Sequence, residues 1–138
     1  MPSRHILLAV DLNAHFAVTL VRYAQAFAAA MGDSLAVLYV SDTYSDSATP
    51  HDAARQWYLQ LNNQLEQPLA EGDLSVRSGS IDTTIVDEIA TRNIDLLMIG
   101  AESRTSLTRL FRGTGTSKIT RSAPCDVLVV SRQRLGMA

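Results

Sequence analysis

Cysteine is nearly absent from this 138-residue sequence, in which Cys125 is the one example. A single cysteine excludes a disulfide within the chain and a zinc site built from several cysteines. The histidines are scattered without the spacing of metal ligands, so no protein-bound metal is expected. No apolar run approaches the roughly 20 residues that span a bilayer, and Met1–His5 lacks the apolar stretch of a signal peptide. These absences predict a cytoplasmic protein with no segment inserted in a membrane.

A strong charge of either sign is also missing. The formal net charge is −2, from 12 Lys and Arg against 14 Asp and Glu. This small imbalance provides no electrostatic reason to expect nucleic acid or an anionic membrane as a partner. Hydrophobic residues make up 46% of the chain, which is ordinary for a globular protein. We therefore expect one domain over residues 1–138, built around one core.

What the sequence does contain is five short runs rich in valine, isoleucine and leucine, separated by longer amphipathic stretches. Four of them are almost continuously apolar, as strands are when both faces of their sheet are covered. The third alternates apolar and polar residues, which favours a position near a sheet edge. The predicted strands are Ile6–Val10, Ser34–Val40, Leu74–Ser78, Leu96–Gly100 and Asp126–Ser131.

Between these runs, apolar residues recur every three or four positions, which predicts helices that bury one face. The first helix ends at Gly32, and the second ends or bends near Pro68. The third begins with Asp82 as its N-cap, and a fourth covers Thr114–Arg121. The apolar stripes are Phe16, Leu20, Ala24, Phe27 and Met31, then Trp57, Leu61, Leu65 and Leu69, then Ile85 and Ile89.

The order βαβαβαβαβ predicts an α/β fold, in which a single five-stranded parallel sheet carries helices on both faces. With the strand order 3-2-1-4-5, the order reverses between the first and fourth strands. Ligands of such sheets bind beyond the carboxyl ends of the strands at that point. Asp11 and Gly100 leave these two strands, so they are expected to line the crevice.

A segment rich in glycine and hydroxyl groups, Gly113–Ser117, opens the predicted fourth helix. Its glycines permit close approach of the backbone to a ligand. The free amides and the dipole at a helix start favour an anion such as phosphate. The alternative is that Gly113 and Thr114 simply end a loop and cap a helix, and the local sequence leaves both interpretations open.

These segments together resemble the universal stress protein family. ATP-binding members of that family carry G-x-x-G, nine residues, and then G-S or G-T. The sequence here reads Gly100–Ser103, nine residues, and then Gly113-Thr114, while Ile6–Asp11 and Ser122–Val130 are similar to the family's first and closing segments. The resemblance implies a Rossmann-like, adenine nucleotide alpha hydrolase-like fold. It also implies an ATP-binding dimer that regulates a stress response.

The resemblance further implies a role for each matching position. Asp11 would contact the ribose side of ATP, Val40 would offer its backbone to the adenine edge, and Gly100 would line the nucleoside pocket. The Gly113–Thr116 segment would hold the phosphates, with Mg²⁺ or Mn²⁺ bridging them. The implied cofactor-binding residues are Ala9, Val10, Asp11, Val40, Ile99, Gly100, Ser103, Gly113, Thr114, Gly115 and Thr116.

Three departures from the ATP-binding pattern keep other functions open. Ser103 replaces the second motif glycine, Glu102 would repel a triphosphate, and Leu12-Asn13 follows Asp11 where binders have Gly-Ser. The first alternative is therefore a stress-responsive interaction module without nucleotide. The second is a slow ATPase, for which no general base stands out beyond Asp11, so no catalytic residue is assigned.

The last predicted strand, Asp126–Ser131, is a candidate surface for binding a second copy of the chain. It would lie at the sheet edge and lacks the proline, lysine or bulge that commonly protects an exposed edge. A second copy of the chain pairing there by two-fold symmetry would satisfy this edge, and the resemblance also implies dimerisation through it. The alternative is that the carboxyl-terminal tail folds back over the strand.

Overall fold

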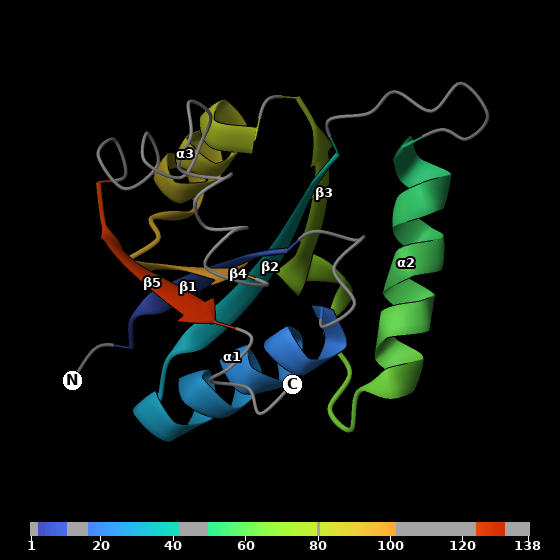
Figure 1. The fold of residues 1–138 in the computed structure, drawn as a ribbon, viewed down its shortest axis with the longest axis horizontal. Coiled ribbons are helices and arrows are strands. Elements are labelled where there is room, and N and C mark those ends of the chain that lie inside the picture. The colour runs from blue at the N-terminus through green and yellow to red at the C-terminus, as the bar shows by residue number, and fades with distance from the viewer. Residues whose placement is uncertain (1–2, 11–16, 42–49, 80, 102–123, 132–138) are drawn as a thin grey trace.

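Five strands form one sheet in the computed structural model, which describes residues 3–10, 17–41, 50–79, 81–101 and 124–131. The strands are β1 (His5–Val10), β2 (Ser34–Ser41), β3 (Leu74–Ser78), β4 (Leu96–Ala101) and β5 (Asp126–Ser131). Figure 1 labels the five strands. All neighbours are parallel, and the order is β3-β2-β1-β4-β5. The predicted order is confirmed, as is the edge position of the third strand. Three strands, β1, β2 and β4, are one residue longer than predicted.

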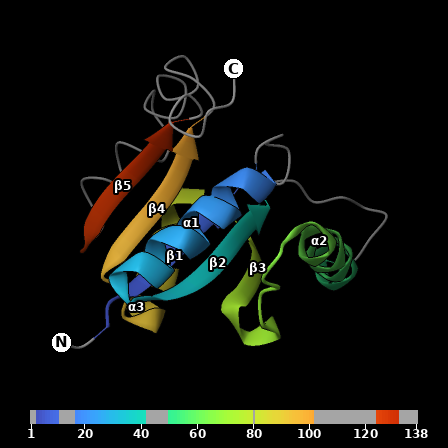
Figure 2. The ribbon, with the colours of Figure 1, turned by 90° about the horizontal axis from the view of Figure 1, so that it is seen from below.

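Helices cover both faces of this sheet. The described elements are α1 (Ala17–Met31), α2 (Pro50–Gln64), a short 3₁₀ turn η1 (Glu71–Asp73) and α3 (Ile81–Arg92). In Figure 2, α1 crosses one face of the central strands, α2 lies beyond β3, and α3 lies on the opposite face. The α/β class with helices on both faces is thus confirmed.

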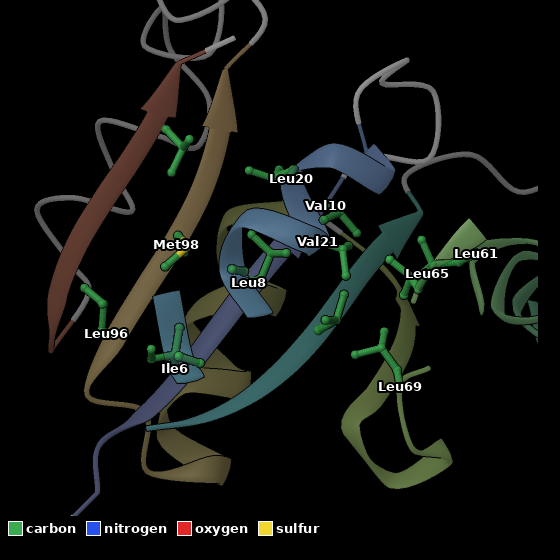
Figure 3. Close-up of a cluster of buried hydrophobic side chains, with 14 residues drawn as sticks. Ile6, Leu8, Val10, Leu20, Val21, Leu61, Leu65, Leu69, Leu96 and Met98 are labelled. Atoms are coloured by element: carbon green, nitrogen blue, oxygen red, sulfur yellow. The ribbon is translucent and has the colours of Figure 1, made fainter. Parts of the chain in front are cut away.

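The sheet is apolar on both sides because each central strand contributes to two cores. Ile6, Leu8 and Val10 of β1 pack in the cluster that includes α1 and the α2 segment (Figure 3). Leu7 points the other way and packs in the cluster of α3, together with Ile89. Since successive side chains of a strand alternate between faces, a strand that is buried on both sides has to be apolar throughout.

Helix α1 ends where the sequence predicts. Gly32 has φ +70°, and the amide of Asp33 donates a hydrogen bond of 2.8 Å to the carbonyl of Ala28. This is the left-handed helix ending that glycine adopts without steric cost. Asn93, with φ +54°, occupies the same position after α3. Asparagine is among the few other residues that tolerate this conformation.

The predicted end of the second helix near Pro68 was wrong, because α2 ends before Leu65. Leu65 and Leu69 are nevertheless buried, as the spacing predicted. The segment after α2 folds back along the helix, where Tyr58 donates its hydroxyl to the carbonyl of Leu69 at 2.7 Å. The amide of Leu69 donates to the side chain of Asn62 at 2.9 Å. Periodicity therefore identified the buried leucines but not the turn that buries them.

Two other helix predictions were wrong in detail. Met31 was expected on the buried stripe of α1 but is 56% exposed, because it is the last helical residue, directly before the exposed Gly32. Asp82 was expected as an N-cap, but α3 begins one residue earlier, at Ile81. Phe16, the side chain of Trp57 and the predicted fourth helix lie outside the described residues.

Candidate functional site

The carboxyl ends of the five parallel strands meet at one edge of the sheet, and the strand order reverses there. After β1 the chain continues to β2 on one side, whereas β4 pairs with β1 on its other side. In open parallel sheets this reversal leaves a crevice beyond the two central strands. The candidate site therefore lies where the paired strands β1 and β4 end side by side.

The register places the ends of these strands at the same level. Ala9 is opposite Ile99 in the β1–β4 pair, so the next residues, Val10 and Gly100, are also level. Gly100 is in turn opposite Val130 of β5. Gly100 thus leaves a position without a side chain between two buried valines at the end of the sheet.

The predicted site residues that the structure describes point their side chains into the two cores. Val10 packs on the α1 face, whereas Ala9, Val40 and Ile99 belong to the α3 cluster. These residues can therefore contact a ligand only through their backbone atoms, and Gly100 can also do so through its Cα, which carries no side chain. Backbone amides and carbonyls are strong hydrogen-bonding groups, so such an edge suits a ligand with polar edges of its own.

The structure brings Ala9, Val10, Val40, Ile99 and Gly100 together at this edge. The remaining predicted site residues lie outside the described part of the chain. They are Asp11, Ser103, Gly113, Thr114, Gly115 and Thr116.

At the opposite edge, polar groups connect the starts of the strands. The backbone amide of His5 donates to the carboxylate of Asp95 at 2.8 Å, and the amide of Asp95 donates to the carbonyl of His5, also at 2.8 Å. The ring Nδ1 of His5 is 2.6 Å from Oγ of Ser34. Among the described residues, no group of three His, Cys, Asp or Glu side chains could hold a metal ion. His5 therefore serves to join strand ends.

An ion-pair network fixes α3 to the edge strand β3. Arg77 contacts Asp87 at 2.7 Å and Glu88 at 3.2 Å, and Arg92 contacts Glu88 at 2.9 Å. Arg92 also donates to the hydroxyl of Ser75. The hydrogen bond that Arg77 donates to Asp87 raises the pKa of Arg77 above its already high ordinary value. Because the two arginines and two carboxylates neutralise one another, we assign them a structural role, which is to hold α3 against β3.

The turn from β3 to α3 was not singled out by the sequence reasoning. Gly79 follows β3 directly and has φ +142°, a conformation that is essentially restricted to glycine. A Cβ at this position would lie 3.0 Å from Oγ1 of Thr84. The position of this glycine directly after a predicted strand could have indicated the turn. Its contact with Thr84 could not have been predicted, because that contact depends on how the chain folds.

None of the helices in the described ranges is long and apolar enough to cross a membrane.

The family comparison gives one match over nearly the whole chain. The model of the universal stress protein family matches residues 2–131. No curated protein matches the sequence significantly.

Several solved structures share the fold. A universal stress protein in complex with cAMP is 19% identical, with a TM-score of 0.68 over 95% of this chain and 98% of that chain. The universal stress protein UspA from Lactobacillus plantarum is 26% identical, with a TM-score of 0.64 over 94% and 99%. A universal stress protein from Archaeoglobus fulgidus in complex with dAMP is 20% identical, with a TM-score of 0.60 over 94% and 99%.

Proposed function

Since this chain belongs to the universal stress protein family, we propose that it binds an adenine nucleotide, with ATP as the expected ligand. The site is the carboxyl end of β1 and β4, and the observation that carries the proposal is the position of Gly100. This glycine ends a central strand at the reversal of strand order, level with the last residue of β1. A ligand can approach the backbone most closely at such a point.

The ligands of two structural neighbours support an adenine nucleotide in particular. One neighbour was solved with cAMP and the other with dAMP. Both compounds join an adenine base to a sugar and a phosphate. The base offers polar ring edges that backbone groups can recognise, and the phosphate needs amides or cations. The backbone-lined edge at Val40 and Gly100 supplies the first requirement.

Within the proposed site, the remaining roles fall on residues outside the described ranges. Asp11 follows β1 directly and contacts the ribose side, while Gly113–Thr116 provides amides and hydroxyls for the phosphates. Mg²⁺ or Mn²⁺ arrives with the triphosphate and neutralises part of its charge. Ser103 ends the preceding Gly100–Ser103 segment, where the glycine of the family's motif would allow closer approach.

The proposed role is that of a dimeric regulator of the stress response whose nucleotide-bound form alters contacts with other proteins. Strand β5 supports the dimer, because it is one edge of the sheet and four consecutive apolar residues lie within it. Two copies that pair along β5 would satisfy this edge. We propose the whole of residues 1–138 as one universal stress protein domain.

Calorimetric titration tests the nucleotide proposal directly. Mg-ATP, cAMP and dAMP are added separately to the purified protein, and binding of at least one with adenine specificity over GTP is expected. Gly113→Asp should weaken Mg-ATP binding at least tenfold, because its carboxylate would repel the phosphates. Gly72→Asp is the matched control, since a Cβ at Gly72 meets nothing within 4 Å. No binding of any of the three nucleotides contradicts the proposal.

The second candidate function is an interaction module that works without nucleotide. Leu12, Asn13, Glu102 and Ser103 favour it, because each departs from the ATP-binding pattern. Under this function, Gly113→Asp protects cells under stress as well as the wild-type protein does. A clear loss of stress survival in the Gly113→Asp strain, with Gly72→Asp unaffected, contradicts it.

A further inference from the structure

Thr84 is a buried polar residue without an assigned role. It lies in the first turns of α3 and is 6% exposed. Its hydroxyl has no hydrogen-bond partner among the residues that the structure describes. Leaving a buried hydroxyl without a partner is unfavourable by roughly 1–3 kcal/mol, and most buried polar atoms in proteins are paired. We therefore expect this hydroxyl to form a hydrogen bond with a group outside the described protein atoms.

The hydroxyl of Thr84 points toward the turn that leaves β3. The distance of 3.0 Å from Oγ1 to the position of a Cβ on Gly79 shows that the two residues are in close contact. The φ of +142° at Gly79 and the absence of its side chain permit this approach. The turn follows Ser78, which is paired with Ser41, the last residue of β2. Thr84 thus faces the same sheet edge as the proposed site.

The start of α3 also packs beside the end of β2. Val40 and Ile85, the residue after Thr84, belong to the same buried cluster. A base that rests against the backbone of Val40 would therefore lie next to the β3–α3 turn. A hydroxyl both donates and accepts hydrogen bonds, so it can pair with either kind of ring atom on a purine edge.

We propose that the Thr84 hydroxyl contacts the purine base of the bound nucleotide, with Gly79 leaving the space for it. This inference rests on the proposed function. It adds a base-contacting group from α3 to a site whose described part is formed by β1, β2 and β4. Thr84 is a ligand-binding residue in this scheme, and it has no part in bond making or breaking.

Thr84→Val tests the inference because valine keeps the shape of threonine and replaces the hydroxyl by a methyl group. Two quantities are measured, the melting temperature without nucleotide and the dissociation constant for Mg-ATP. The melting temperature should stay the same or rise, since an unpartnered buried hydroxyl is removed. The dissociation constant should rise roughly three- to tenfold, because a hydrogen bond to the base is lost. Inorganic triphosphate, which has no base, should bind both proteins equally.

Thr83→Val is the matched control, because Thr83 is the exposed neighbour on the same helix. It should leave both quantities unchanged. A lower melting temperature for Thr84→Val without nucleotide would show that the hydroxyl is bonded within the protein, and this overturns the inference. An unchanged dissociation constant for Mg-ATP overturns it as well, while the proposed function stands. If the wild-type protein binds no nucleotide at all, the proposed function and this inference both fail.

Discussion

Asp33 receives three hydrogen bonds from Arg4. The backbone amide of Arg4 donates to Oδ1 at 3.0 Å, and its guanidinium donates to Oδ2 through Nε at 3.2 Å and through Nη2 at 3.0 Å. The Asp33 side chain is 4% exposed, whereas that of Arg4 is 41% exposed. Since these residues precede β2 and β1, the carboxylate aligns the two strands at their starts.

Replacing Asp33 by alanine should therefore destabilise the protein. The buried end of the pair disappears, and the amide and guanidinium of Arg4 lose their acceptor. We expect the free energy of unfolding to fall by about 1–3 kcal/mol. Urea denaturation measures it, with Asp73→Ala as the control at an exposed position. Equal losses in the two variants would contradict the role of Asp33.

Gly79→Ala should be destabilising for two separate reasons. Alanine is strained at φ +142°, and its Cβ would lie 3.0 Å from Thr84 Oγ1. Backbone strain of this kind amounts to about 1–3 kcal/mol. Gly72→Ala provides the comparison, because its Cβ would meet nothing within 4 Å. In thermal unfolding, Gly79→Ala should have a clearly lower melting temperature than Gly72→Ala. Equal melting temperatures would show that the turn accommodates the alanine and would contradict the prediction.

Glu88 should matter more to stability than its neighbour Asp87, although both pair with Arg77. The Glu88 side chain is 10% exposed and also accepts from Arg92, whereas that of Asp87 is 57% exposed. Glu88→Ala should lower the free energy of unfolding by about 1–3 kcal/mol. Asp87→Ala should lower it by less than about 1 kcal/mol, because water screens an exposed pair. The reverse ranking in a denaturation series would refute this assignment.

Cys125 should react slowly with alkylating reagents in the folded protein. Burial raises the pKa of its thiol, the backbone amide of Leu97 offsets part of this effect, and the carboxylates of Asp126 and Asp95 raise it further. The thiolate is the reactive form, so iodoacetamide should modify the folded protein more slowly than urea-unfolded protein at pH 8.5. Mass spectrometry follows the reaction, and equal rates would contradict the prediction.

The same shift in the pKa of Cys125 sets the sign of a pH effect on stability. The folded state holds the thiol proton more tightly than the unfolded chain, whose thiol ionises near pH ~8.5. This contribution to stability is present below that pH and is lost as the pH rises through the folded pKa. Cys125→Ser should therefore show a smaller decrease in stability between pH 8 and pH 10 than the wild-type protein.

The proposed dimer can be tested with one lysine on each edge of the sheet. Val129 of β5 and Val76 of β3 are both half-buried valines on edge strands. Val129→Lys should convert the dimer to monomer, because lysine opposes pairing between edges. Val76→Lys should leave the dimer intact. Light scattering after size-exclusion chromatography distinguishes the species, and a wild-type monomer at all concentrations would exclude the dimer.

The sheet was predictable from the sequence because its central strands are buried on both sides. Runs such as Leu96–Gly100 are apolar throughout, and this pattern distinguishes them from the amphipathic helices around them. The strand order required only the rules for parallel connections. The exposure of Met31 was not predictable from periodicity, because it depends on where a helix ends relative to the sheet.

The polar contacts of α3 were harder to predict from the sequence. The contact of Thr84 with Gly79 and the pairing of Arg77 with Glu88 join residues from different elements. Their distances follow from how α3 packs on the sheet, which no local pattern encodes. By contrast, Gly100 was predicted as a site residue because its position relative to the strand reversal follows from topology alone.

The central position of β1 has a consequence for how the chain emerges from the ribosome. One side of β1 pairs with β2, but its other side pairs with β4, about 90 residues later in the chain, as in the contact of His5 with Asp95. The middle of the sheet thus stays incomplete until most of the protein has been synthesised. Folds with such distant pairings form slowly, and unpaired strands invite aggregation. We therefore expect the apolar edge of β1 to stay unpaired until β4 has been synthesised.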